Sequence, residues 1–550
     1  MPSRLFPPFT LFGRFPLPAG VIYAAYAAFF LTVLAIGLGI HGDYGVSFDE
    51  RQQRYSGGVS LKHVVERIAP RLLPDSASRL PALDDYADRD YGVAFELPAA
   101  ALEVLLGIKD DREVMLFRHL LTFLVALAGI VAVERMAYRR FRDGRLALLA
   151  AAFLVLSPRL FAESFYNSKD IVFMALFAVA TWAAVEFVLR PRPWTALLAA
   201  VAAALAIDVR IMAVILPCAT LSILALRVAK RQAAPQAIAL TIPLYAIALC
   251  VAVVAMWPWL WSAPVTNFIQ AFQNMAKFRW EGDVLYLGTV VPGGALPWHY
   301  VGVWIAVTTP LLYLALFVAG ASMVLGRLAS ARLQLWKDDD ELQDLFYLGL
   351  VVVPLVAVIG LKSVLYDGWR QMYFIYPAFL MIAVRGFAGL WESGLPGPHR
   401  RVALAAIVAV TLGHTAWWMW REHPFQNVYF NHLAGVGAGA GAGSRFELDY
   451  WGVSNRQGLD YILKTDPSEV ITVAAASFTP LADAGYMLRA DDRKRIKYTA
   501  DVASAQYLFT NYRMVRDPIA QRQALSEECD PYYEIKVGGH AILTIYRRKL

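Results

Sequence analysis

Residues 21–50 read VIYAAYAAFFLTVLAIGLGIHGDYGVSFDE, and this stretch joins a long apolar run to the acidic pair Asp49-Glu50. About 20 apolar residues are enough to cross a bilayer as an α-helix. The run 21–40 therefore predicts a membrane span, and because it lacks a clear small-residue cleavage site we interpret it as a retained span and not as a signal peptide. A carboxylate just beyond a span is well placed to act on a substrate that is anchored in the membrane.

The composition is typical of a polytopic membrane protein. Of the 550 residues, 58% are hydrophobic and 17% are charged, a balance that soluble domains rarely reach. The net charge of +7 is explained in such a protein by Arg-rich cytoplasmic loops, so it does not indicate a nucleic-acid partner. The cysteines Cys218, Cys250 and Cys529 form neither a disulfide framework nor a metal-ligand pattern, and the sequence has no P-loop motif.

The apolar runs predict about eleven membrane spans. They lie near 21–40, 114–134, 146–163, 171–189, 194–208, 211–228, 236–257, 301–325, 345–362, 371–389 and 402–420. The fifth and sixth of these spans are short and are separated by Asp208 and Arg210. We divide them because a single helix of their combined length would overrun the bilayer.

Arginine and lysine residues predict the orientation. They gather before the first span, between the second and third, and after the fourth, sixth, eighth and tenth. By the positive-inside rule these loops face the cytoplasm, which places the N-terminus inside. The loop 41–113, the loop 258–300 and the tail 421–550 are then outside, in agreement with an odd number of spans.

The outer segments are long enough to carry structure of their own. In the first outer loop, the stretches 58–72 and 92–107 mix apolar and charged residues and predict helices along the membrane surface. After residue 420 the Gly/Ala tract 435–443 predicts a linker. Strand-like runs follow at 470–475, 507–510, 533–537 and 541–546, with helical runs at 459–463 and 519–525. The predicted architecture is mainly α: a transmembrane domain over 1–420 and a small extracytoplasmic α/β domain over 421–550.

Polar residues gather at the outer ends of the spans. Five separate connections supply Asp49, Glu50, Arg118, Lys169, Asp170, Asp208, Arg210, Arg279, His299, Lys362, Asp367, Arg370 and Tyr373. Ionisable residues near the membrane are costly and are usually functional or paired. Carboxylates can act as general bases, and Arg and Lys can hold a phosphate. One base and several cations at a shared cavity would suit displacement of a phosphate from a sugar carbon.

Each of these residues also has a structural interpretation. Asp49-Glu50 could be solvated loop charges, Arg118 a snorkelling residue at a helix start, and Lys169-Asp170 an ion pair. For any one residue, the structural interpretation explains its position as well as a functional role does. Their shared side of the membrane is what favours function.

Several short motifs resemble one class of membrane enzymes. They are Phe48-Asp49-Glu50, Leu116-Phe117-Arg118-His119, Ser157-Pro158-Arg159, Asn167-Ser168-Lys169-Asp170, Trp257-Pro258, Leu285-Tyr286-Leu287-Gly288, Pro297-Trp298-His299-Tyr300 and Tyr366-Asp367-Gly368-Trp369-Arg370. In order and sidedness they resemble the GT-C integral membrane glycosyltransferases, in the branch of protein O-mannosyltransferases and lipid A aminoarabinose transferases. The resemblance covers roughly residues 15–420, and His423-Pro424 and the later motif 446–452 resemble bacterial members. Lys169 beside Asp170 is a departure from the class.

The resemblance implies inverting transfer of a sugar from a polyprenyl-phosphate donor to an acceptor hydroxyl, outside the cytoplasmic (inner) membrane of a bacterium. Asp49 would be the general base, assisted by Glu50 and Asp170. The implied phosphate ligands are Arg118, Lys169, Arg210 and Arg370, and the implied pocket residues are Arg279, Trp280, Tyr286, His299, Asp367 and Tyr373. The acceptor could be a lipid, a glycan or a protein. We expect no required cofactor, although a divalent cation is possible, and membrane lipid is an expected partner.

Two other functions fit parts of the sequence. In a secondary transporter the same charges would line a translocation path, but inverted repeats and polar residues at mid-membrane would then be expected. A membrane scaffold whose tail domain binds a partner would leave the convergent charges unexplained.

Overall fold

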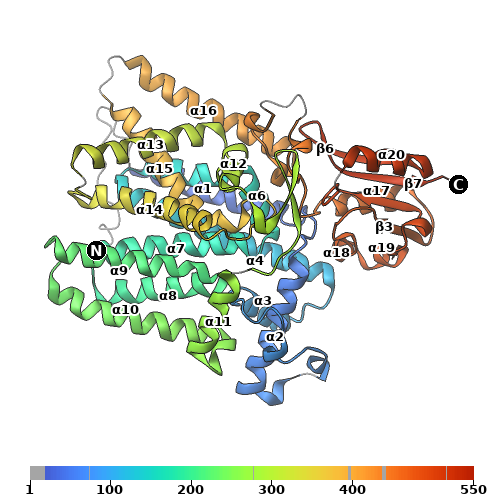
Figure 1. Cartoon of the computed structure of the whole chain (residues 1–550), viewed down its shortest axis with the longest axis horizontal. Coiled ribbons are helices and arrows are strands. Elements are labelled where there is room, and N and C mark those ends of the chain that lie inside the picture. The colour runs from blue at the N-terminus through green and yellow to red at the C-terminus, as the bar shows by residue number, and fades with distance from the viewer. Residues whose placement is uncertain are drawn as a thin grey trace.

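The computed structural model describes residues 19–73, 75–276, 278–332, 334–393, 398–435, 441–515 and 517–549. It consists of a bundle of long helices with a small α/β domain at one end (Figure 1). The predicted fold class is confirmed. The predicted linker 435–443 lies partly outside the described residues, since 436–440 are not among them.

Within the described ranges, eight helices are long and apolar enough to cross a membrane. They are α4 (Asp111–Phe141), α7 (Asp170–Leu189), Ile211–Ala229 with α9 (Ile215–Ala229), α10 (Pro235–Met256), α13 (Leu311–Ser330), α14 (Asp339–Gly360), Arg370–Glu392 with α15 (Tyr376–Glu392), and His399–Arg421 within α16 (Pro398–Arg421). A bent pair, α5 (Gly144–Val155) and α6 (Pro158–Tyr166), could form a ninth span. Two shorter apolar helices, in α1 (Ala19–Ile40) and α8 (Pro193–Val209), correspond to the remaining predicted spans. The chain is a multi-pass membrane protein.

Two predicted spans are broken where a proline follows a residue with extended backbone. The segment 146–163 bends by 68° between α5 and α6, before Pro158. The segment 301–325 divides into α12 (Tyr300–Thr308) and α13 at Pro310. The residue before proline is disfavoured in the α conformation, and proline has no N–H to donate, so both helices end there. The break between α5 and α6 returns the chain toward Asp170, at the start of α7.

The centre of the bundle is α7, which packs against α4 and α8, while α8 packs against α10. The crossing of α13 and α15 depends on two glycines. A Cβ on Gly320 would lie 2.0 Å from the Ile382 carbonyl oxygen, and one on Gly386 would lie 2.0 Å from that of Leu316. Only glycine allows backbones this close, as is usual for small residues at membrane helix crossings.

The two loops that the sequence predicts to be outside, 41–113 and 258–300, form short elements toward the same end of the bundle as the α/β domain (Figure 1). In the first outer loop these are α2 (Glu50–Ile68) and α3 (Glu96–Leu105), close to the two predicted surface helices. In the second they are α11 (Pro264–Ala276) and the hairpin of β1 (Asp283–Tyr286) and β2 (Thr289–Pro292).

The C-terminal domain contains a five-stranded sheet in the order β4-β3-β5-β7-β6. The strands are β3 (Ile471–Ala475), β4 (Ile496–Tyr498), β5 (Tyr507–Thr510), β6 (Cys529–Val537) and β7 (His540–Arg548), and the helices are α17 (Asn455–Thr465), α18 (Leu481–Ala484), α19 (Ala490–Arg495) and α20 (Pro518–Glu528). Strand β3 pairs in parallel with β4 and β5, and the antiparallel hairpin of β6 and β7 completes the sheet. The sequence missed β4, because a three-residue strand offers no alternation to detect.

This domain is docked on the first outer loop. Arg456 donates hydrogen bonds to the carbonyl oxygens of Gly42 and Tyr44. The Phe48 amide donates to the Trp451 carbonyl oxygen at 3.2 Å. Because Asp49 directly follows Phe48, the docked domain helps to fix the backbone that carries this carboxylate.

Candidate functional site

One buried arginine collects three carboxylates from three parts of the chain. Arg370 Nη1 donates to Asp49 Oδ2 at 2.7 Å and to Asp170 Oδ2 at 2.9 Å, and Arg370 Nη2 lies 3.3 Å from Asp367 Oδ2. The Arg370 side chain is 2% exposed, whereas that of Asp49 is 27% exposed. We call Asp49, Lys169, Asp170, Arg210, Asp367 and Arg370 the outer ionic cluster.

Asp170 begins α7, where the positive end of the helix dipole favours a carboxylate. The Asn167 side chain accepts a hydrogen bond from the Asp170 amide at 2.8 Å, which fixes this turn. Arg210, in the connection between α8 and α9, bonds to the same carboxylate. Asp170 thus joins two arginines that lie far apart in the sequence.

Lys169 adds a third cation to the cluster. Its ammonium group lies 3.3 Å from the centroid of the Tyr91 ring, in a cation–π contact. Burial, aided by Arg210, lowers the pKa of Lys169 to about 8. Burial would raise the pKa of Asp49, but Arg370 and Lys169 outweigh it and hold that pKa below its usual value. Asp49 is therefore ionised at neutral pH.

Aromatic rings enclose the cluster. The Arg370 guanidinium lies 4.8 Å from the Tyr366 ring centroid and 4.6 Å from that of Trp451. Trp280 stacks on Tyr366 with ring centroids 4.4 Å apart. Trp280 thus contacts the cluster only indirectly, through Tyr366.

Two separate cavities meet the outer ionic cluster. A cavity of ≈ 740 Å³ is lined by Asp49, with Phe48, Gln52 and Arg54 among its other residues. Asp49 is the cluster residue that this cavity exposes, so the solvent-facing carboxylate and the open space coincide.

The second cavity, of ≈ 180 Å³, meets the cluster at Arg210 and is also lined by Tyr91 and Tyr366. Most of its remaining wall is apolar: Val209, Ile211, Met212, Phe272, Met275, Ala276, Phe278, Val358, Val364 and Leu365. The two cavities share no lining residue. The cluster therefore has two approaches: the one at Asp49 also carries the charged side chains of Arg51, Arg54 and Asp483, and the one at Arg210 is mainly apolar.

The structure does not bring Glu50 or Arg118 to the cluster. Glu50 accepts hydrogen bonds from the Ser47 amide at 2.6 Å and from His119 at 2.8 Å. Arg118 bonds to the carboxylates of Glu96 and Glu103. Consecutive residues at a helix start point in different directions, which is why Glu50 leaves the side of Asp49. Both residues are buried in local pairs of their own.

Three of the predicted pocket residues lie away from the cluster. Arg279 is half exposed and pairs with Asp88 at 2.9 Å. Tyr286 and His299 bond to each other at 2.6 Å, beside Phe446. Of the pocket residues, only Asp367 belongs to the outer ionic cluster.

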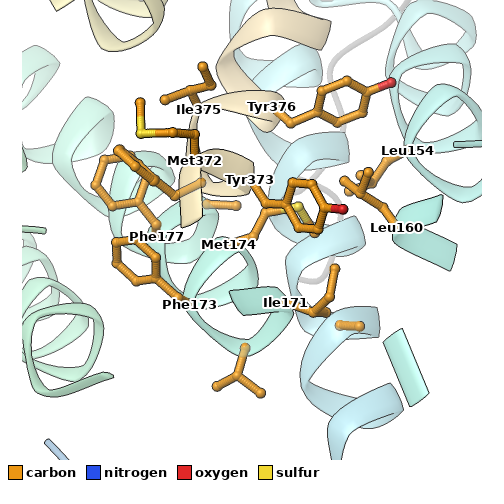
Figure 2. Close-up of a cluster of buried hydrophobic side chains, with 14 of the residues drawn as sticks. Leu154, Leu160, Ile171, Phe173, Met174, Phe177, Met372, Tyr373, Ile375 and Tyr376 are labelled. Carbon is orange, nitrogen blue, oxygen red and sulfur yellow. The ribbon is translucent and has the colours of Figure 1, made fainter. Parts of the chain in front are cut away.

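Tyr373 is a core residue. Figure 2 shows it among Leu160, Ile171, Met174 and other apolar side chains. Its hydroxyl donates to Glu163 at 2.9 Å. The sequence placed Tyr373 near the site because it follows Arg370 closely, but the turn Arg370–Ile375 carries it inward.

Sequence reasoning missed Tyr91, Trp451 and Arg513 as neighbours of the site. Arg513 Nη2 donates to Asp367 Oδ1 at 2.7 Å from the C-terminal domain. Trp451 was visible within the bacterial motif 446–452, but the sequence contains no signal for the roles of Tyr91 and Arg513. Within the described parts of the chain, no group of three or more His, Cys, Asp and Glu side chains could hold a metal ion.

Comparisons with known proteins show which proteins the chain is similar to. Residues 100–259 match the family model described as Dolichyl-phosphate-mannose-protein mannosyltransferase. The matched range includes Lys169, Asp170 and Arg210. Among curated protein sequences no match is found.

Solved structures extend the likeness to nearly the whole chain. The crystal structure of ArnT from Cupriavidus metallidurans in the apo state matches with a TM-score of 0.51 and 12% identity, over 95% of this chain and 98% of ArnT. ArnT bound to undecaprenyl phosphate gives 0.49 and 13%, over 96% and 98%. The Archaeoglobus fulgidus oligosaccharyltransferase complex with Zn and sulfate gives 0.41 and 10%, over 94% and 73%. The resemblance drawn from the sequence is thus confirmed, and the chain has the ArnT-like GT-C fold.

Proposed function

We propose that this protein is a glycosyltransferase that moves a sugar from a polyprenyl-phosphate donor to an acceptor hydroxyl, with inversion. The observation that carries the proposal is the outer ionic cluster with its two approaches, a mainly apolar one at Arg210 and one with several charged side chains at Asp49. The match of residues 100–259 to a family of lipid-phosphate-sugar transferases, and the ArnT-like fold, support it.

The donor would approach through the apolar cavity. A polyprenyl chain needs an apolar wall, and its phosphate needs cations at the end of that wall. Arg210 and Arg370 each have a buried Nε–H without a hydrogen-bond partner among the described residues. An unpaired buried donor costs free energy, which a phosphate oxygen would recover.

The acceptor would approach through the larger cavity, where Asp49 is the exposed carboxylate of the cluster. Asp49 would take the proton of the acceptor hydroxyl. The acceptor oxygen would then bond to the anomeric carbon as the bond from that carbon to the phosphate oxygen breaks. The electron pair stays on the phosphate, where Arg210, Lys169 and Arg370 stabilise the developing charge. Attack from the side opposite the phosphate inverts the anomeric carbon.

The remaining predicted roles follow from the contacts. Asp170 would position Arg210 and Arg370 between the two approaches. Trp451 and Arg513 contact the cluster, and the C-terminal domain lies at one end of the bundle. The distribution of basic loops supports the extracytoplasmic side of a bacterial inner membrane for that end. The N-terminus would then be cytoplasmic.

The test separates donor binding from chemistry. In cells that lack the gene, the wild-type chain should restore one hexose- or pentose-sized mass to an envelope lipid, glycan or protein, as seen by mass spectrometry. Asp49→Asn should lower that transfer about 10²- to 10⁴-fold, the range for loss of a general base. The purified variant should still bind undecaprenyl phosphate in nanodiscs. Asp491→Asn is the control, because Asp491 is an exposed carboxylate on α19. Full sugar transfer by the Asp49→Asn variant would exclude Asp49 as the general base.

A further inference from the structure

The C-terminal domain places a buried cation beside the site. Arg513 lies just after β5, between Tyr512 and Met514, which have positive φ angles of 62° and 56°. This unusual backbone directs the Arg513 side chain out of the sheet toward the helical bundle, where it is 5% exposed. Figure 1 shows the sheet of the C-terminal domain at one end of the helical bundle.

Arg513 and Arg370 share one carboxylate. Arg513 Nη2 donates to Asp367 Oδ1 at 2.7 Å, and Arg370 Nη2 lies 3.3 Å from Asp367 Oδ2. Asp367 is itself strained, with φ of 54°, so its carboxylate is held in a defined direction by the turn and by Arg513. Each guanidinium therefore limits where the carboxylate, and through it the other guanidinium, can lie.

Arg513 also contacts the segments on either side of the site. Its guanidinium lies 5.2 Å from the ring centroids of Phe48 and of Phe478. Its Nη1 donates at 2.9 Å to the carbonyl oxygen of Tyr450, the residue before Trp451. Phe48 precedes Asp49, and the Trp451 ring covers Arg370. Besides Asp367, this one side chain thus contacts two segments that border the outer ionic cluster.

We propose that Arg513 is a positioning residue: it holds Asp367, and Asp367 aims the Arg370 guanidinium at the donor phosphate. The inference rests on the proposed function. Without Arg513, the buried Asp367 carboxylate keeps a single cationic partner, Arg370, and an incompletely compensated buried carboxylate is costly. It protonates or rotates, and Arg370 Nη2 loses its fixed partner. The C-terminal domain is then a part of the site and not only a cover over it.

A double-mutant cycle tests the coupling in the full chain, in nanodiscs, with undecaprenyl phosphate as the binding probe. We expect Arg513→Gln and Asp367→Asn each to raise the Kd about tenfold, the loss of one hydrogen bond to a charged group. Because they act through one another, the double variant should bind within about twofold of either single variant. Arg513→Lys keeps a donor for Asp367 and should recover most of the affinity.

Arg522→Gln is the matched control. Arg522 belongs to the same domain but is 44% exposed and pairs with Glu534, so its loss should leave the Kd unchanged. Two outcomes would overturn the inference while leaving the proposed function intact. One is a Kd for Arg513→Gln equal to that for Arg522→Gln. The other is a double variant in which the Kd effects of the two single variants add fully. If Arg513→Gln does not fold, Arg513→Lys and Asp367→Asn still test the inference. Unchanged affinity in Asp367→Asn would refute the coupling of Arg513 to Arg370 through Asp367. Failure of the wild-type chain to bind the probe would overturn the proposed function, and this inference with it.

Discussion

The protein has a second ionic cluster, toward the opposite end of the bundle, and it differs from the first in kind. There Asp344 accepts hydrogen bonds from Arg140 Nε at 2.7 Å and from Arg385 Nε at 3.1 Å. Asp340 pairs with Arg142 at 3.1 Å, and Arg227 pairs with Asp339 at 3.0 Å. We call these residues the inner ionic cluster. They join the acidic start of α14 to the basic ends of neighbouring helices.

The two clusters are built from similar residue types, but the inner ionic cluster centres on the carboxylate Asp344 and the outer ionic cluster on Arg370. In the inner cluster one carboxylate is shared by two arginines, whereas in the outer cluster one arginine is shared by three carboxylates. The outer cluster also lines two cavities and has aromatic walls. A count of ion pairs would rank the two alike. A candidate site differs from ion pairs that only hold helices together, because several carboxylates converge on one cation beside a cavity.

The largest expected difference is between Arg370 and Arg140. Arg370→Gln should weaken undecaprenyl phosphate binding about tenfold to a hundredfold, because a hydrogen bond to a charged group contributes about 1.5–3 kcal/mol. It also leaves three carboxylates to repel the phosphate. Arg140→Gln removes a bidentate pair with Asp344 and should lower the Tm while leaving the affinity unchanged. Titration calorimetry and thermal melts of both variants measure the two effects, and equal affinities would remove the distinction between the clusters.

A smaller effect on the affinity for undecaprenyl phosphate is expected from a change in pH. The pKa of Lys169 is lowered to about 8, so its ammonium group is charged below that pH and neutral above it. The affinity for undecaprenyl phosphate should therefore fall as the pH rises from 7 to 9. Lys169→Arg keeps its charge throughout this range, since the guanidinium pKa exceeds 12, and should flatten the profile. A wild-type profile that is flat over this interval would show that Lys169 does not contact the phosphate.

The smallest effect on binding is expected at Arg118. The sequence resemblance implied a phosphate ligand there, but the structure pairs Arg118 with Glu96 and Glu103. Arg118→Gln should change the Kd for undecaprenyl phosphate by less than about twofold, within the error of additivity for uncoupled sites. Its stability should fall by about 3–5 kcal/mol, because the variant leaves two buried carboxylates without their cation. A tenfold loss of affinity without loss of stability would restore Arg118 to the donor site.

The fold class could be predicted from the sequence because the patterns that indicate spans and strands are local. Spans follow from apolar length, and strands such as β5 and the hairpin of β6 and β7 follow from short strand-like runs and a Gly-Gly turn. The breaks before Pro158 and Pro310 were visible as prolines, but their effect depends on where the next helix must pack. Local patterns do not specify that packing.

The site was only partly predictable for the same reason. Asp49, Lys169, Asp170 and Arg370 were found from their shared side and from the motifs that contain them, and Arg210 from its shared side alone. Glu50 was predicted to belong to the site because it follows Asp49 in the sequence, but the turn into α2 directs its side chain to His119. Arg513 was missed because its partner Asp367 is 146 positions away, and no short motif describes a contact of that range.

The most direct test of the account is a structure of the full chain with undecaprenyl phosphate bound, determined in nanodiscs by cryo-EM. We predict that the phosphate lies within hydrogen-bond distance of Arg210 and Arg370, with the polyprenyl chain along the apolar cavity that Phe272 and Leu365 line. Asp49 should then remain open to the larger cavity. A phosphate bound away from both arginines, for example beside Tyr286 and His299, would contradict the central claim.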